Sequence, residues 1–252
     1  MRRLLPFAGT FLLLSAAAPA RADDQADAKA LIDQAIKARG GADNLAKYKA
    51  DVLKIKGTVH VSGLDIDFTG EISFQQPDKS RAVIEGTVMG TNFKSTRVVN
   101  GDKGWIDDPQ GARDMSKEEL AEERESQNAN AIARLAVLAD KAYTLSTVGE
   151  SKVGDKEAVG ILVKRKGYRD VSLFFDKQTH LLLKSETRVK DPQGGGATEF
   201  TQEAFYDDYK KVGDLQVAHK LTIKRDGKAF LESETTDFKP EEKLDDRLFA
   251  KP

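Results

Sequence analysis

Apolar and polar residues alternate along the segment LDIDFTGEISFQQP, residues 64–77. The even positions from 64 to 74 carry apolar side chains and one glycine, whereas the odd positions from 65 to 73 carry Asp, Thr, Glu and Ser. Because successive side chains of a β-strand point to opposite faces, this pattern predicts a long strand with one apolar and one polar face. A charged outer face is typical of an antiparallel sheet. Later segments repeat the pattern, so we expect one large antiparallel sheet whose apolar face must be covered.

The first residues, MRRLLPFAGTFLLLSAAAPARADD, have the pattern of a secretory signal. Two arginines precede a short apolar run, and Ala20-Arg21-Ala22 offers the small-x-small pattern of a cleavage site, so we expect cleavage after Ala22. The alternative, a membrane anchor, is disfavoured because a spanning helix needs ~20 apolar residues. The chain has no cysteine and therefore no disulfide. We expect a periplasmic protein with a signal peptide at 1–22 and a single domain at 23–252.

The charges exclude one class of partner. Lysine and arginine together number 40 and the acidic residues 41, with the two signs interspersed along the chain. Removal of the signal would take three arginines and no acidic residue, which leaves a weakly acidic protein. Since no basic stripe is available to neutralise phosphates, nucleic acid is not an expected partner.

Two helices are predicted. In residues 24–39 the apolar side chains recur at helical spacing, and Gly40-Gly41 ends the segment. A short helical turn over 43–49 follows. The second helix begins at a capping box formed by Ser116 and Glu119 and continues through a polar, acidic stretch to about residue 130. It interrupts two runs of strands, and two interpretations remain open: a lid over the sheet, or a crossover that covers a sheet edge.

Further strands are expected on both sides of this middle helix. Turn signals at Ser62-Gly63, Asn100-Gly101 and Asp226-Gly227 separate neighbouring strands. The run 191–196 is predicted to be a hairpin tip, and Leu248 and Phe249 are expected to dock the C-terminal tail. The strands are expected near 53–61, 81–89, 92–99, 105, 143, 159–163, 171–175, 181–183, 200–209, 217–224 and 230–238.

No catalytic constellation is visible. The three histidines are isolated, and none has a partner at metal-ligand spacing. There is no G-x-S-x-G motif, and the glycines 194–196 lack the Lys-Ser/Thr of a phosphate loop. We therefore predict a protein that is not an enzyme and has no metal site or cofactor.

Three segments resemble, in order, the periplasmic lipoprotein carriers of the LolA/LolB type. FTGEISFQQPDKSR (68–81) is similar to their Gly-x-ϕ-x-ϕ…Pro-x-x-x-Arg signature. VVNGDKGWIDDP (98–109) resembles their Asn/Asp-Gly-x-x-Trp strand, and LFFDKQTHLLLKSE (173–186) resembles a hairpin common in that superfamily. The match keeps Arg81 but has Gln76 where the lipoprotein-sorting carrier has an arginine tied to lid closure, which favours a relative that handles some other amphiphile.

The resemblance implies a mainly β (α+β) fold: an unclosed, curved antiparallel half-barrel with helices across its mouth and acyl chains on its concave apolar face. We therefore predict a carrier or binder of a lipid or acyl chain, monomeric, with the N-terminal and middle helices as lid. Burial alone, at ~25 cal/mol per Å², would hold one chain. The predicted cavity wall consists of Ile55, Val59, Leu64, Ile66, Phe68, Ile72, Phe74 and Trp105.

Three alternatives remain. The same side chains could form a closed core with helices packed directly on the sheet, because an apolar strand face is usually core. The protein could be an envelope sensor or interaction module that binds a membrane-protein partner, in which case an exposed apolar patch is expected outside the cavity. A hydrolase would need a carboxylate or serine that points into the cavity.

Overall fold

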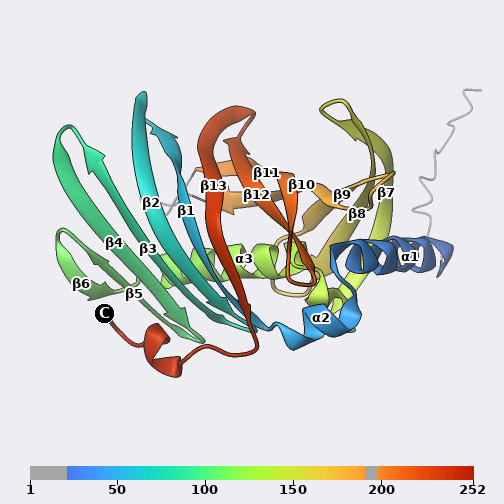
Figure 1. The fold of residues 1–252 in the computed structure, drawn as a ribbon, viewed down its shortest axis with the longest axis horizontal. Helices are drawn as coiled ribbons and strands as arrows, with labels where there is room; N and C mark the ends of the chain where they lie inside the picture. Colours follow the sequence, from blue (N-terminus) through green and yellow to red (C-terminus); the bar gives the residue numbers. More distant parts are fainter. Residues whose placement is uncertain (1–21, 191–197) are drawn as a thin grey trace, which may run out of the picture.

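A computed structural model describes residues 22–190 and 198–252, and these form one 13-stranded antiparallel sheet with three α-helices (Figure 1). The predicted hairpin tip at 191–196 lies outside the described residues. So does the predicted signal at 1–22, except for Ala22, which is the first residue of α1. The helices are α1 (Ala22–Arg39), α2 (Ala42–Lys47) and α3 (Lys117–Ala133), with short 3₁₀ turns η1 (Ala136–Ala139) and η2 (Asp246–Phe249). The strands are β1 (Ala50–Val61), β2 (Leu64–Gln75), β3 (Lys79–Val88), β4 (Thr91–Asn100), β5 (Lys103–Asp108), β6 (Gly111–Asp114), β7 (Tyr143–Val153), β8 (Lys156–Arg165), β9 (Val171–Asp176), β10 (Leu182–Lys190), β11 (Glu199–Val212), β12 (Leu215–Arg225) and β13 (Lys228–Glu241).

The sheet is curved but not closed. Its order is β6-β5-β4-β3-β2-β1-β13-β12-β11-β10-β9-β8-β7, so β6 and β7 are its two edges. All neighbours are joined as antiparallel hairpins except β1 and β13, the first and last strands of the sequence, which pair in the middle of the sheet. Figure 1 shows the strands curving around α3 as an open half-barrel. The predicted fold class is confirmed.

Turn residues fix the hairpin registers. Ser62 and Gly63 both have positive φ, at 53° and 77°, and so do Asp226 and Gly227, at 46° and 76°. Two consecutive residues with positive φ are typical of the tight turns whose twist suits antiparallel strands. These turns pair Val61 with Leu64 and Arg225 with Lys228. A register shift of one residue would exchange the apolar and polar faces, so the turns set which side chains face inward.

One part of the half-barrel is a filled core. The apolar stripe of α1 (Ala28, Ile32 and Ala35) is at most 2% exposed. It packs with the end of α3, with η1 and with strands β7 to β10, whose contributions include Leu173 and Phe175. Because this stripe is completely buried, α1 is part of the core of that region. In this region of β7 to β10 the helices pack directly on the sheet.

The helix α3 runs across the concave side of the curved sheet (Figure 1). Its first turn is fixed by the predicted capping box, in which the Glu119 amide donates to Ser116 Oγ at 3.1 Å and the Ser116 amide donates to Glu119 Oε2 at 2.8 Å. At the other end of the chain, Phe249 of η2 is completely buried, which confirms that the C-terminal tail docks. We refer to α3 below as the crossing helix.

Candidate ligand-binding face

The register gathers seven of the eight predicted wall residues on one face of the sheet. Val59 pairs with Ile66, Ile55 with Gly70, and Leu53 with Ile72, and opposed residues of an antiparallel pair share a face. Arg97 lies on the same face, because Ile72 pairs with Ala82 and Ala82 with Arg97. Its guanidinium reaches Glu123 of the crossing helix at 2.9 Å. We call this side, toward the crossing helix, the inner face. The seven residues are Ile55, Val59, Leu64, Ile66, Phe68, Ile72 and Phe74.

Trp105 lies on the opposite, outer face. It pairs with Val98, which pairs with Arg81, which pairs with Ser73. This row alternates with the one that contains Ile72, so the prediction that Trp105 belongs to the inner wall was wrong. The motif placed Trp105 in a strand correctly, but its face depends on the registers of three successive strand pairs. The resemblance to the carrier motifs does not specify these registers.

Exposure of the inner-face residues changes along the strands. Phe74 and Phe68 are 4% and 6% exposed, whereas Leu64, at the end of the β1–β2 hairpin, is 42% exposed. Val59 and Ile66 lie between these extremes and are half-buried. The inner face is therefore most open at the end of the β1–β2 hairpin.

Phe74 is covered by a buried ion pair. The Arg134 guanidinium lies 4.0 Å from the centroid of the Phe74 ring. Its Nε and Nη2 donate to the two carboxylate oxygens of Asp51 at 3.1 and 2.9 Å. An aromatic ring beneath a paired guanidinium is part of the floor and is not free to contact a chain. The available apolar surface therefore begins above Phe74.

The inner face continues across the middle of the sheet onto β12 and β13. Val59 pairs with Leu231, and Leu231 pairs with Ile223, so these side chains extend the row that begins at Ile66. Leu221 lies two residues before Ile223 on the same face. Leu221 and Ile223 were not predicted as wall residues. Their alternation within the predicted strand 217–224 was a signal of the same kind as in β2, but the sequence did not indicate that β12 lies near β1.

A cavity of about 260 Å³ lies between the crossing helix and this extension. One wall is the helix, including Ala129 and Asn130, and the other is β10 to β12. The lining is mixed: Ala204, Leu221 and Ile223 are apolar, while the hydroxyl groups of Ser185 and Tyr206 lie 3.1 Å apart and hydrogen bond to each other. Burial raises the pKa of Tyr206. We call this space the crossing-helix cavity. It is lined by Glu125, Ser126, Ala129, Asn130, Ser185, Thr187, Arg188, Val189, Gln202, Ala204, Tyr206, Leu221 and Ile223.

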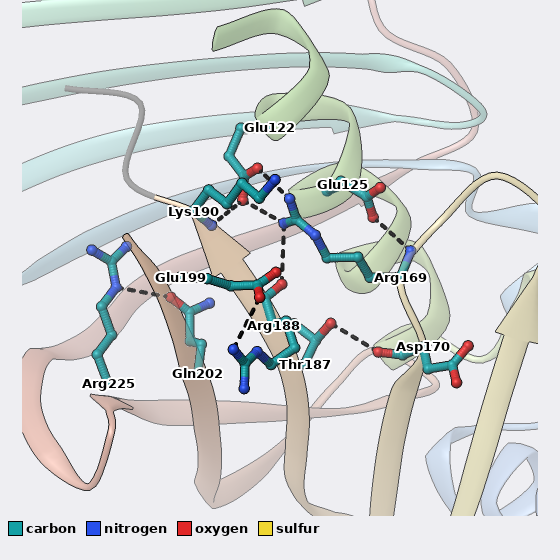
Figure 2. A network of polar contacts seen from close by, with 10 residues as sticks. All are labelled: Glu122, Glu125, Arg169, Asp170, Thr187, Arg188, Lys190, Glu199, Gln202 and Arg225. Carbon is teal, nitrogen blue, oxygen red and sulfur yellow. Dashed lines mark hydrogen bonds and ion pairs between the residues drawn. The ribbon is translucent and has the colours of Figure 1, made fainter. Parts of the chain in front are cut away.

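An arginine holds one side of the crossing helix to the sheet (Figure 2). Arg169, between β8 and β9, donates Nη1 and Nη2 to the two oxygens of Glu122 at 2.6 and 2.8 Å. Its backbone amide donates to Glu125 at 3.0 Å, and the Lys190 amide donates to Glu122 at 2.7 Å. Burial alone would raise the pKa of Glu122, but the hydrogen bonds from Arg169 and Lys190 outweigh it, and the pKa is lowered. Glu122 is thus held ionised.

The other side of the crossing helix is attached to β3, β4 and β6. Besides the Arg97–Glu123 pair, Gln127 Nε2 donates to Ser80 Oγ at 2.8 Å. Arg113 donates both terminal nitrogens to Glu119 at 2.8 Å, and this bidentate contact lowers the pKa of Glu119 to about 2. The helix is therefore attached along both sides by polar contacts. No local motif predicts Arg169 with Glu122, which lie 47 residues apart.

The outer face differs in chemistry. An open groove of about 1330 Å³ is lined mainly by charged and hydroxyl side chains of this face, such as Lys56, Asp67 and Glu85, together with Phe68, Phe93 and Leu221. Lys56 pairs with Glu234 at 3.2 Å, and Thr58 donates to Asp67 at 2.7 Å. Within residues 22–190 and 198–252, no group of three or more histidine, aspartate or glutamate side chains could hold a metal ion.

The two positions singled out by the resemblance lie apart. Arg81 is on the outer face, 3.9 Å from Glu71. Gln76 follows β2, and its backbone amide donates to the Lys49 carbonyl at 2.9 Å.

None of the helices in the described part of the chain is long and apolar enough to cross a membrane.

Comparison with known proteins identifies the fold. No family model and no curated protein matches the chain. Among solved structures, a LolA superfamily protein from Nitrosomonas europaea is similar with a TM-score of 0.59 and 13% identity, over 89% of this chain and 97% of that one. A DUF1329 family protein from Desulfovibrio piger gives 0.57 and 14%, over 88% and 97%. An outer membrane lipoprotein-sorting protein domain from Vibrio parahaemolyticus gives 0.52 and 12%, over 89% and 97%. At such identities the likeness shows a shared fold, and the resemblance is confirmed at that level.

Proposed function

Because the chain has the fold of LolA superfamily proteins, we propose that it is a periplasmic, monomeric carrier or binder of a lipid or acyl chain. Residues 1–22 would be its signal peptide and 23–252 its single domain. The proposal assigns no bond-making or bond-breaking step to the protein. The ligand would lie on the inner face and enter the crossing-helix cavity.

One observation carries this proposal: the inner-face apolar row that contains Ile66, Val59, Leu231 and Ile223 runs without a break into a hollow under the crossing helix. Side chains of a finished core are close to completely buried, as in the β7 to β10 region. In the inner-face row, by contrast, the apolar side chains of Ile66, Val59, Leu231 and Ile223 remain half-buried. A row of half-buried apolar side chains beside a cavity is the arrangement that a chain-shaped apolar ligand would complete.

The size of the cavity suggests how much of a ligand it would take. A water molecule's share of liquid volume is about 30 Å³, and a methylene group is of similar size, so 260 Å³ corresponds to roughly nine methylenes. Each buried methylene contributes about 0.8 kcal/mol. The cavity would therefore hold part of one acyl chain, and the rest of the ligand would lie on the open inner face toward Leu64.

The test starts with protein purified from the native periplasm and extracted with organic solvent, and the extract is searched for lipid by mass spectrometry. The delipidated protein is then titrated with a fluorescent fatty acid. Ile223→Gln should weaken binding because it puts an amide in the apolar row. Val148→Gln is the matched control, since Val148 lies on β7 and is 46% exposed. A delipidated wild-type protein that binds no probe would contradict the proposal.

A second candidate function is supported by exposed apolar side chains outside the cavity. Val61 and Leu64 are 40% and 42% exposed at the β1–β2 hairpin, and Met89 is 90% exposed at the neighbouring β3–β4 hairpin. Such side chains on adjacent hairpin ends fit contact with an envelope protein. Site-specific photocrosslinking from position 89 in cells would distinguish the two: a crosslinked protein supports the interaction module, and capture of lipid alone argues against it.

A further inference from the structure

A second cavity lies on the other side of the crossing helix. Its volume is about 570 Å³, and the helix contributes Arg124, Gln127, Asn128 and Ala131 to its wall. These positions have helical spacing and form one side of α3, whereas residues 125, 126, 129 and 130 line the crossing-helix cavity. The remaining wall includes the β2–β3 turn, the segment after η1, and Tyr143, Arg165 and Tyr168. We call this space the arginine cavity.

The two arginines of this cavity lack a carboxylate partner. Seven arginines of the described chain form ion pairs with carboxylates: Arg81, Arg97, Arg113, Arg134, Arg169, Arg188 and Arg247. Within the same described residues, neither Arg124 nor Arg165 forms one. Arg124 donates Nε and Nη2 to the Gly101 carbonyl at 3.3 and 2.9 Å, and Arg165 donates Nη1 to Asn128 at 2.9 Å. Both bonds are to neutral oxygens, so neither guanidinium group is paired directly with a carboxylate.

Asn128 adds a buried donor beside Arg165. Arginine has only donors, so the Asn128 atom that meets Arg165 must be the carbonyl oxygen Oδ1. This orientation fixes Nδ2 as the remaining atom, and Nδ2 is buried without an acceptor among the described residues. Asn128 itself is 4% exposed. A buried amide donor without an acceptor is unfavourable, and an oxygen supplied by a ligand would relieve it.

Aromatic rings hold Arg165 in place. Its guanidinium carbon lies 4.4 Å from the ring centroid of Tyr168 and 5.4 Å from that of Tyr143. Arg165 is thereby oriented before any ligand arrives. The acidic residues that line the cavity, Asp78 and Asp140, are exposed, whereas Arg165 and Arg124 are half-buried. The donors of this cavity are therefore more buried than its carboxylates.

We propose that the arginine cavity binds a small organic oxyanion, a carboxylate or a phosphate ester, through Arg165, Arg124 and the Asn128 amide. Guanidinium groups donate to both kinds of oxyanion in the same geometry. The volume of 570 Å³ is far larger than an inorganic ion needs, which favours an organic molecule. This site shares no residue with the crossing-helix cavity and does not depend on the proposed function.

The test is calorimetric titration of the full mature protein at low ionic strength with succinate and with glycerol 3-phosphate. Succinamide and glycerol are the neutral controls of matched shape. We expect at least one anion to bind and the neutral compounds not to bind, and the responding anion identifies the oxyanion class. Binding should weaken as salt is added, because the interaction is between charges.

Arg165→Met should weaken binding of the responding anion about tenfold or more, the loss expected for a charge-assisted hydrogen bond. Arg81→Met, on the outer face, is the matched control and should bind as the wild type does. If Arg165→Met does not fold, as judged by circular dichroism, Arg124→Met takes its place. Kd values above about 1 mM for both anions, equal binding of the neutral compounds, or unchanged binding by the folded arginine variant would each overturn the inference.

Discussion

Ala204→Phe tests whether the crossing-helix cavity takes an acyl chain. Ala204 lies on the inner face of β11, where it pairs with Ser185 of β10 and Ile223 of β12, and it lines the cavity. Its side chain therefore points toward the crossing helix. Phenylalanine is well tolerated in strands, so the substitution should leave β11 intact.

The expected loss of affinity follows from volume. The added ring occupies about 100 Å³, roughly three to four times a water molecule's share of liquid volume. It would thus remove more than a third of the 260 Å³ cavity. A chain would lose room for three to four methylenes at about 0.8 kcal/mol each, or about 3 kcal/mol. Since 1.4 kcal/mol is a factor of ten, affinity for a long-chain fatty acid should fall about 100-fold.

The assay is fluorescent fatty acid titration, together with urea unfolding to check the fold. Ala229→Phe is the matched control, because Ala229 is an exposed alanine of β13. Ala204→Phe should lower the free energy of unfolding by no more than the ~1–3 kcal/mol that overpacking causes. A folded Ala204→Phe protein that binds the fatty acid as tightly as the wild type would refute the placement of the chain in this cavity.

Three further predictions concern stability. Arg134→Met should lower the free energy of unfolding by about 3–5 kcal/mol, because it leaves the Asp51 carboxylate buried without its partner; urea denaturation measures this, and a change below about 1 kcal/mol would contradict it. The pKa of Glu119 is about 2 against an ordinary 4.5, so its contribution to the free energy of unfolding is complete above pH 4.5 and is lost as the pH falls toward 2. Glu119→Gln should therefore reduce the pH dependence of the urea midpoint between pH 4.5 and 2. An unchanged pH dependence would show that the pair with Arg113 does not stabilise the fold. Phe249→Ala should cost about 3–5 kcal/mol because the ring is fully buried, and a melting temperature equal to that of the wild type would mean that the tail does not stabilise the sheet.

Local patterns predicted the elements well. The alternation over 64–77 became β2, which ends at Gln75, before Pro77. The Ser116 capping box starts α3 at Lys117, and the glycines after residue 39 end α1 at Arg39. Each of these signals acts between residues that are near one another in the chain, so the sequence states them directly.

The candidate site was predicted only in part. Seven wall residues share the inner face because a strand's faces follow from alternation, and β1 and β2 are joined by a two-residue turn. Phe74 shares the face but is covered by Arg134, 60 positions away in the chain and unrelated to it by any local pattern. Trp105 was misplaced because its face depends on three successive registers.

The sequence by itself determined that this chain forms one amphipathic antiparallel sheet with a helix at its start and a capped polar helix in its middle. Only the tertiary structure decided which part of that sheet is filled. The helix α1 packs on β7 to β10 and completes a core there, whereas the crossing helix is held by Arg169 and Arg97 above a hollow bounded by β10 to β12. Periodicity reports which side of a strand is apolar, but whether that side meets a side chain or an empty space depends on contacts between residues far apart in the chain.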